Sequence, residues 1–162
     1  GRKMKKRYQK SVRRNVKSPS PPEDVTQIVQ GLLKCGHFLQ REMNQVFQQF
    51  GLKQQQFSVL NEIIWHGPLT QKELGERLLF EKSNVSKIVK ILFERKWIGV
   101  AVDTHDRRLT LLSETPKGFA TWEKSMQAFR ESSSELISIL SESEQLNAII
   151  FLNTLQNAFK TK

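Results

Sequence analysis

Two adjacent arginines lie at the tip of a segment that the sequence predicts to be a β-hairpin. The stretch GVAVDTHDRRLTLL, residues 99–112, has short apolar and β-branched runs on either side of a polar tip, a pattern typical of two strands joined by a turn. Arg107 and Arg108 directly follow Asp106 in this tip. Arginines at so exposed a place either are solvated turn residues or bind a negatively charged partner.

A second basic segment directly precedes this hairpin. Residues 82–97, KSNVSKIVKILFERKW, contain five basic residues and a single acid, Glu94. Asparagine can pair bidentately with adenine, lysine can reach guanine or a phosphate, and the major groove of DNA admits one helix. A charged helical face is usually just solvated, but the basic hairpin that follows favours binding. The candidate major-groove residues are Ser83, Asn84, Ser86, Lys87 and Lys90.

The elements that would position these residues follow from hydrophobic periodicity and from helix caps. Apolar residues at three- and four-residue steps predict a long helix over about 24–50 and a second over 54–66. TQKE at 70–73 is a capping box that opens a short third helix, and a fourth begins near Lys82. In that fourth helix Val85, Ile88, Val89 and Leu92 form the apolar stripe. The hairpin strands are expected near 97–102 and 108–113.

The C-terminal third is predicted to be helical throughout, with a short break. Thr115-Pro116-Lys117-Gly118 opens a helix whose apolar positions fit an a/d heptad seam, and SESEQ at 141–145 caps a final helix. The seam indicates either a helix of a second subunit or packing on the first helix of the same chain. Its residues are Phe119, Trp122, Met126, Phe129, Ser133, Leu136 and Leu140.

The positive charge is concentrated at one end of the chain. Of the 162 residues, 26 are basic and 16 acidic, yet residues 1–17 hold nine of the basic residues and no acid. This arm is either a solvated tail or a contact to the phosphates of a polyanion. The segment SPSPPED, 18–24, is expected to be a non-helical linker because its prolines lack N–H donors.

In its middle third the chain resembles the MarR/SlyA family of transcriptional regulators. The resemblance runs from about residue 57 to 118 and includes GPLTQKELGERL, SNVSKIVKILFERKWI, DTHDRR and SETPKG. It implies a mainly α fold with a small β-hairpin wing, that is, a winged helix-turn-helix combined with long dimerisation helices. The implied domains are a basic arm and Pro/Ser linker at 1–22, a dimerisation region at 23–50 and 115–162, and a DNA-binding domain at 51–114.

The resemblance also assigns roles to the wing. Carried over residue by residue, Asp106 steadies the wing, Arg108 enters the minor groove and Arg107 contacts phosphate. The candidate DNA-backbone contacts are Thr70, Gln71 and Lys82.

Three positions depart from the family pattern. Lys96 stands where glycine is usual, so it is expected either to hold a positive φ or to end the helix differently. Glu81 stands where a serine cap is common in the family, so Ser83 is expected to cap the helix instead. Gly99 lies early in a strand, where glycine weakens strand pairing.

The same resemblance implies a homodimer. In the family, the first helix and the last two helices of each subunit interlock with those of the other. Two recognition helices about one DNA turn apart, roughly 34 Å, would then read a pseudo-palindromic operator in double-stranded DNA. The predicted function is therefore a dimeric, sequence-specific DNA-binding transcriptional regulator, with repression expected, although the sequence itself does not give the sign of regulation. The alternative is a winged-helix protein-interaction module or a non-specific architectural DNA-binding module.

Members of this family often respond to a small-molecule effector, and the resemblance implies such an effector here. No cofactor is expected. The candidate pocket residues are Phe38, Trp65, His66 and Trp122, although aromatics at helical spacing more often belong to the core. Cys35, the single cysteine, is placed on the apolar side of the first helix, so it is expected to be buried rather than an oxidant sensor. No histidine pair has zinc-ligand spacing.

No sequence feature indicates an enzyme or a membrane protein. The sequence lacks a G-x-S-x-G motif, a Walker loop and a run of about 18 apolar residues. A single cysteine and the absence of an apolar signal segment favour the cytoplasm.

Overall fold

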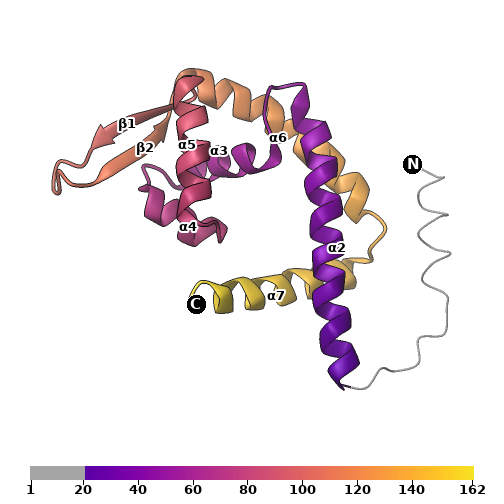
Figure 1. The fold of residues 1–162 in the computed structure, drawn as a ribbon. Coiled ribbons are helices and arrows are strands. Elements are labelled where there is room, and N and C mark those ends of the chain that lie inside the picture. Colours follow the sequence, from indigo (N-terminus) through magenta and orange to yellow (C-terminus); the bar gives the residue numbers. More distant parts are fainter. Residues whose placement is uncertain (1–20) are drawn as a thin grey trace.

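The computed structural model describes residues 21–162, so the basic arm at 1–17 and most of the predicted linker lie outside the described residues. Six helices and one hairpin follow in the predicted order of helix, helix, helix, helix, hairpin, long helix, helix (Figure 1). The bounds are α2 Pro21–Gln48, α3 Gln54–His66, α4 Gln71–Leu78, α5 Lys82–Glu94, β1 Ile98–Val102, β2 Thr110–Glu114, α6 Pro116–Ile137 and α7 Glu142–Phe159.

The helices α3 to α5 and the hairpin form the winged helix-turn-helix that the sequence predicts. Strands β1 and β2 pair antiparallel, with Ile98 opposite Glu114 and Val102 opposite Thr110. Leu69, which precedes α4, adds a bridge to Leu112 on the other edge of β2. Beyond this anchored base the hairpin extends away from the helices as a two-stranded arm (Figure 1).

The core of this unit is built from the apolar stripes that the sequence displays. Val85, Ile88, Val89 and Leu92 of α5 are all buried, as predicted. They belong to one cluster with the buried faces of α3 and of the strand bases. The helix α5 is therefore fixed by its apolar side, and its opposite side remains at the surface.

The helix α6 packs within its own chain, which is one of the two arrangements expected from the sequence. Phe129 of the seam stacks on Phe47 of α2 and lies 5.4 Å from Phe57 of α3, measured between ring centroids. Trp122 is buried against the same core. The helix ends at Ile137, so Leu140 lies beyond it. The heptad pattern alone is thus satisfied by α2 and α3 and does not require a second subunit.

The start of α2 also differs from the expected linker. The helix begins at Pro21, inside the SPSPPED segment that was expected to be non-helical. Proline is compatible with the first turn of a helix, because the N–H groups there have no partner within the helix. The carboxylates of Glu23 and Asp24 in the same turn interact favourably with the positive end of the helix dipole. The prolines therefore begin this helix rather than exclude it.

The predicted helix caps are confirmed at α4 and α7, and one is corrected at α5. Thr70 accepts from the N–H of Glu73, whose carboxylate accepts from the N–H of Thr70. Ser141 and Glu144 form the same reciprocal pair at α7. At α5 Glu81 occupies the cap position without a side-chain cap bond, so Ser83 does not replace it and the helix begins at Lys82.

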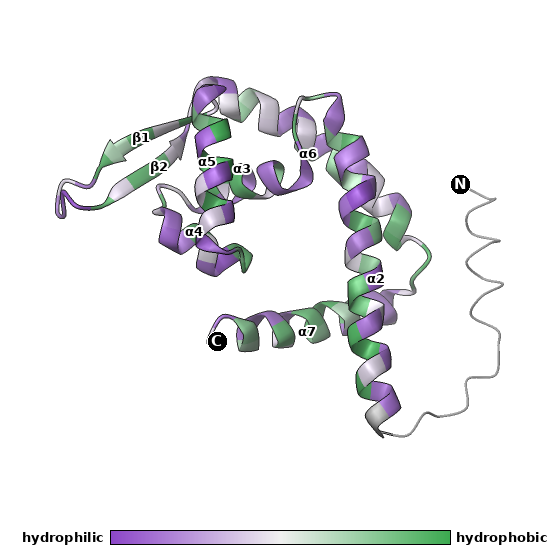
Figure 2. Ribbon diagram, in the orientation of Figure 1, coloured by the Kyte–Doolittle hydropathy of each residue, from purple (hydrophilic) through white to green (hydrophobic). Residues whose placement is uncertain are grey.

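Two helices leave apolar side chains at the surface of the single chain. The helix α7 has no buried residue, although it carries Leu146, Ile149, Ile150, Phe151 and Phe159. The first half of α2 likewise exposes Val25, Ile28, Val29 and Leu33. Figure 2 shows α7 as a largely hydrophobic ribbon that runs apart from α3 to α5. Within residues 21–162 no helix has both the length and the hydropathy to cross a membrane.

Within residues 21–162, two residues other than glycine adopt left-handed backbone conformations, one before and one after α5. Leu79, in the turn between α4 and α5, has a φ of 58°, and Lys96, just after α5, has a φ of 60°. The positive φ of Lys96 is one of the two outcomes expected from the sequence. A side chain with a Cβ adopts this conformation at a cost of about 1–2 kcal/mol, which glycine avoids.

We predict that Lys96→Gly raises the free energy of unfolding by about 1 kcal/mol, because glycine relieves the left-handed backbone strain. Chemical denaturation of both proteins measures the difference. The matched control is Lys96→Ala, which removes the same charge but keeps a Cβ and so should bring no gain. An equal gain in both variants would attribute the effect to charge and contradict the backbone argument.

Candidate nucleic-acid interface

The tip of the wing is organised around one carboxylate–guanidinium pair. Asp106 Oδ1 accepts from Arg108 Nε at 3.1 Å, and Oδ2 accepts from Nη2 at 3.2 Å. Asp106 Oδ1 also accepts from the backbone N–H of Arg108 at 3.0 Å. These bonds lower the pKa of Asp106, the side-chain bond contributing most. The side chain of Arg108 is nevertheless 90% exposed, so the pair aims the arginine without covering it.

The backbone of the tip is closed by a second aspartate. Asp103 Oδ1 accepts from the N–H of His105 at 2.7 Å, and the N–H of Asp103 donates to the carbonyl of Leu109 at 3.0 Å. The N–H of Leu109 in turn donates to the carbonyl of Asp106. Arg107 and Arg108 therefore project from a turn that these hydrogen bonds close.

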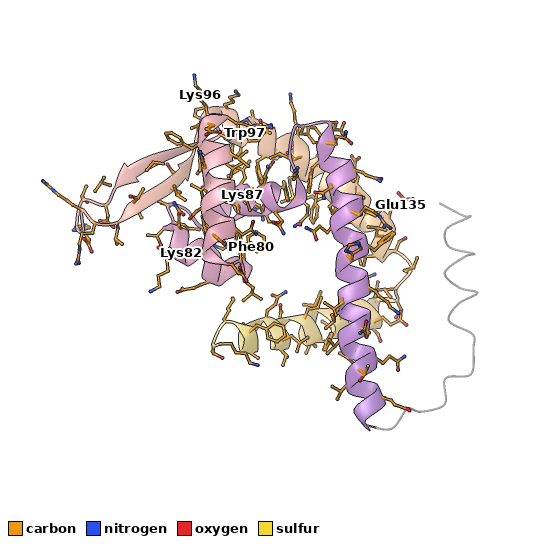
Figure 3. The ribbon with its side chains drawn as sticks, in the orientation of Figure 1. Phe80, Lys82, Lys87, Lys96, Trp97 and Glu135 are labelled. Carbon is orange, nitrogen blue, oxygen red and sulfur yellow. The ribbon has the colours of Figure 1, made fainter. Side chains whose placement is uncertain are left out.

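The exposed side of α5 carries the residues expected to face the major groove. Ser83, Lys87 and Lys90 are exposed, opposite the buried stripe of the helix. Figure 3 shows Lys82 and Lys87 along α5, with Lys96 and Trp97 past its far end, where the chain turns into the hairpin. Basic groups thus extend over the length of the helix toward the wing.

The two remaining candidates on α5 lie at the flanks of this surface and are hydrogen-bonded to neighbouring helices. Asn84 is half-buried, and its Nδ2 donates to Gln55 Oε1 of α3 at 3.0 Å. Ser86 is exposed, and its hydroxyl donates to Gln71 Oε1 of α4 at 2.9 Å. Sequence reasoning missed Gln55, because no local signal connects residues that are so far apart in the chain.

The three candidate backbone contacts meet at the start of α4 and α5. The hydroxyl of Thr70 is occupied in the capping box, where it also donates to Glu73 Oε1 at 3.0 Å. Gln71 and Lys82 are exposed and line one hollow, whose other wall is the C-terminal end of the chain from Phe159. Thr70 is half-buried, so the more accessible groups of the three are Gln71 and Lys82.

The four candidate pocket residues are only partly brought together. Trp65 and Trp122 meet edge to face with ring centroids 5.9 Å apart, and Trp122 Nε1 donates to Asn61 Oδ1 at 2.9 Å. His66 follows Trp65 in the chain, and its Nε2 lies 3.8 Å from Glu62 Oε2. Phe38 lies on α2 against Arg41 and lines a separate shallow hollow.

A cavity of about 490 Å³ lies between α2, α3 and α6. Its walls include Met43, Phe57 and Phe129, with polar groups from Gln55 and Asn61. None of the four candidate pocket residues lines it. Glu62 also lines this cavity, and its Oε2 forms an ion pair with Arg77 Nε of α4 at 2.7 Å. The helix α3 therefore supplies both a wall of the cavity and a contact to the helix-turn-helix.

The cysteine prediction is corrected by the structure. Cys35 is exposed rather than buried, because the first half of α2 extends beyond the core of its own chain. Among the described residues no group of three or more His, Cys, Asp or Glu side chains is arranged to hold a metal ion.

Comparisons with known proteins bear on this geometry. A model of the MarR family matches residues 50–109, which include α3, α4, α5, β1 and the wing tip. The chain is 27% identical over 101 residues to the HTH-type transcriptional regulator YwaE of Bacillus subtilis, a match that covers 62% of this chain and 59% of YwaE. It is 28% identical to the HTH-type transcriptional repressor MdtR of the same organism, over 76% of this chain and 79% of MdtR.

The fold is similar to that of solved structures as well. A mutant E. coli MarR complexed with operator DNA superposes with a TM-score of 0.75 at 19% identity, covering 85% of this chain and 99% of that protein. The likeness confirms the winged-helix fold, including the helices on either side of it. Since the match to YwaE spans less than two thirds of that protein, what the whole protein does is a matter for proposal.

The wing pair makes a prediction about protonation. We expect Arg108→Ala to raise the pKa of Asp106 toward its ordinary value, because the guanidinium that favours the carboxylate is removed. The contribution of the pair to wing order is complete above the ordinary aspartate pKa of about 3.9 and is lost as the pH falls through the lowered value. An NMR pH titration of the Asp106 carboxyl carbon measures the shift.

Arg107→Ala is the matched control for this titration. It removes the neighbouring arginine, which makes no bond to Asp106 in the described structure, and should leave the pKa of Asp106 unchanged. Equal shifts in the two variants would contradict the paired geometry.

Proposed function

This chain carries the winged helix of the MarR family, and from that premise we propose that the protein is a dimeric, sequence-specific DNA-binding transcriptional regulator. The observation that carries the proposal is the exposed Arg108, braced by Asp106 on a hairpin that begins directly after the basic helix α5. In the proposed complex α5 lies in the major groove and Arg108 enters the adjacent minor groove. Arg107 contacts a phosphate.

The brace supports this role for Arg108 on physical grounds. Its Nε and Nη2 are held by the two oxygens of Asp106, while Nη1 takes no part in that pair. A narrow minor groove concentrates negative potential and attracts an arginine side chain. A side chain that is already oriented loses less conformational entropy on binding. The aspartate thus keeps the arginine extended at the tip before DNA arrives.

A second copy of the chain is the proposed partner of the exposed apolar helices. The apolar residues of α7 and the first half of α2 would be buried in a two-fold interface, the commonest form of assembly. Two copies present two recognition helices about one DNA turn apart, roughly 34 Å, which implies a pseudo-palindromic operator. Such a protein acts where the chromosome lies, in the cytoplasm.

Repression and its release by a small molecule complete the proposal. MdtR, one of the similar proteins, is named a repressor. The cavity of about 490 Å³ between α2, α3 and α6 has room for a small apolar ligand next to the helix that supports α5. Trp65, His66 and Trp122 remain a second candidate wall, with Trp65 and Trp122 already in contact, whereas Phe38 would line a separate hollow. No catalytic function is proposed.

Binding to the duplex upstream of the protein's own gene, measured by fluorescence anisotropy across a salt series, tests DNA recognition. We expect a preference of about 10³ or more over a scrambled duplex at physiological salt. Arg108→Ala should weaken specific binding by about 1–3 kcal/mol, and Arg107→Ala should mainly reduce the salt slope by about one. Equal, steeply salt-dependent binding to both duplexes would instead favour a non-specific architectural role, and no binding would favour a protein-interaction module.

Sedimentation equilibrium tests the proposed interface separately from DNA. The wild-type chain should sediment as a dimer, and Ile150→Asp should shift it to the monomer, because a carboxylate would be buried in an apolar contact. Asn147→Asp adds the same charge to an exposed polar position of α7 and is the control that should remain dimeric. A monomeric wild type, or a dimer unaffected by Ile150→Asp, would remove α7 from the interface.

A further inference from the structure

We propose that Gln55 is a positioning residue for DNA recognition: it orients the amide of Asn84 and so determines which base Asn84 prefers, without touching DNA itself. The inference rests on the proposed function, since it concerns how that surface reads sequence. It assigns specificity to α3, a helix that lies behind the recognition helix and belongs to its supporting core.

The geometry that carries the proposal is one side-chain hydrogen bond between two helices. Asn84 Nδ2 on the first turn of α5 donates to Gln55 Oε1 on the first turn of α3 at 3.0 Å. Both side chains are half-buried, so water competes with this bond less than it would at a fully exposed site. Asn84 lies beside the exposed face formed by Ser83 and Lys87, at the edge nearest α3.

The orientation of an amide matters because its two ends carry opposite hydrogen-bonding groups. Bidentate recognition of adenine requires one acceptor and one N–H donor from the asparagine, whereas cytosine offers only a donor in the major groove. An unrestrained amide can turn over and present its two ends in either order. With one N–H of Nδ2 donated to Gln55, Oδ1 and the second N–H remain available in a fixed order.

The backbone that carries Gln55 is held in place by its surroundings. The next residues of α3, Gln56 and Phe57, are buried, and Gln56 Oε1 accepts from the N–H of Lys53 at 3.0 Å. The backbone N–H of Gln54 donates to Asn44 Oδ1 of α2 at 2.7 Å. The first turn of α3 is thus anchored to α2 and to the core, so it provides a fixed reference for the side chain of Asn84.

The experiment compares base preference among five forms of the full chain. Each is used to select from a pool of random duplexes, and its affinity is then measured for the preferred duplex and for every single base-pair substitution of it. The forms are wild type, Asn84→Ala, Gln55→Met, Gln55→Glu and Gln54→Met. Thermal unfolding of each form checks that it is folded.

The expected results follow from what each side chain can accept or donate. Asn84→Ala identifies the base pair that Asn84 reads. Gln55→Met keeps the length of the side chain but loses its hydrogen-bond acceptor, and it should lower discrimination against other bases at that same pair roughly tenfold. Gln55→Glu keeps an acceptor and should retain the preference. Its added charge weakens binding to all sequences alike, because phosphate contacts do not specify sequence. Gln54→Met should retain the preference too, because the Gln54 side chain bonds Ser58 of its own helix.

Each contrary result has a distinct meaning. A wild type that enriches no sequence would overturn the proposed function and, with it, this inference. A wild type with a clear preference that Asn84→Ala or Gln55→Met leaves unchanged would overturn the inference alone. Loss of the preference in Gln55→Glu as well would exclude the acceptor role of Gln55. The same loss in Gln54→Met would reduce the effect to general packing at the start of α3.

Discussion

The position of the whole candidate interface depends on three phenylalanine rings from three helices. Phe47 of α2 stacks on Phe57 of α3 with ring centroids 4.3 Å apart, and Phe129 of α6 lies 6.0 Å from Phe47 and 5.4 Å from Phe57. Aromatic pairs of this kind contribute about 0.5–1.5 kcal/mol beyond the area they bury. They fix α3 against the two long helices. Since α5 packs on α3 and the wing follows α5, the basic side chains of α5 and of the wing take their positions from this cluster.

The same cluster shows which of the two expected partners the heptad seam of α6 has. The heptad seam of α6 has the spacing of an intermolecular coiled coil, but Phe129 and Trp122 are buried by α2 and α3 of the same chain. Spacing specifies that a helix needs a partner and not which partner, because an intramolecular helix offers the same grooves. The unsatisfied apolar surface lies instead on α7 and on the first half of α2, where Cys35 is exposed for the same reason.

The features that sequence reasoning predicted well are those decided within a few residues. Capping boxes at Thr70 and Ser141 and the buried stripe of α5 join residues that are close in the chain. Contacts between distant segments could not be predicted in this way. The bond from Asn84 to Gln55 joins residues 29 apart, and the left-handed turn at Leu79 carries no glycine or asparagine to mark it.

Two different kinds of constraint therefore act on the helix α5. Its axis is fixed by the buried stripe on one side and by the tight backbone turns at Leu79 and Lys96 on either end. Its side-chain directions are fixed separately, by neutral hydrogen bonds from Asn84 and Ser86 to the neighbouring helices. Backbone packing resists large displacements, whereas a single neutral hydrogen bond contributes only about 0.5–1.5 kcal/mol. Substitutions behind α5 can consequently change the directions of its exposed side chains while the fold of the helix remains as it is.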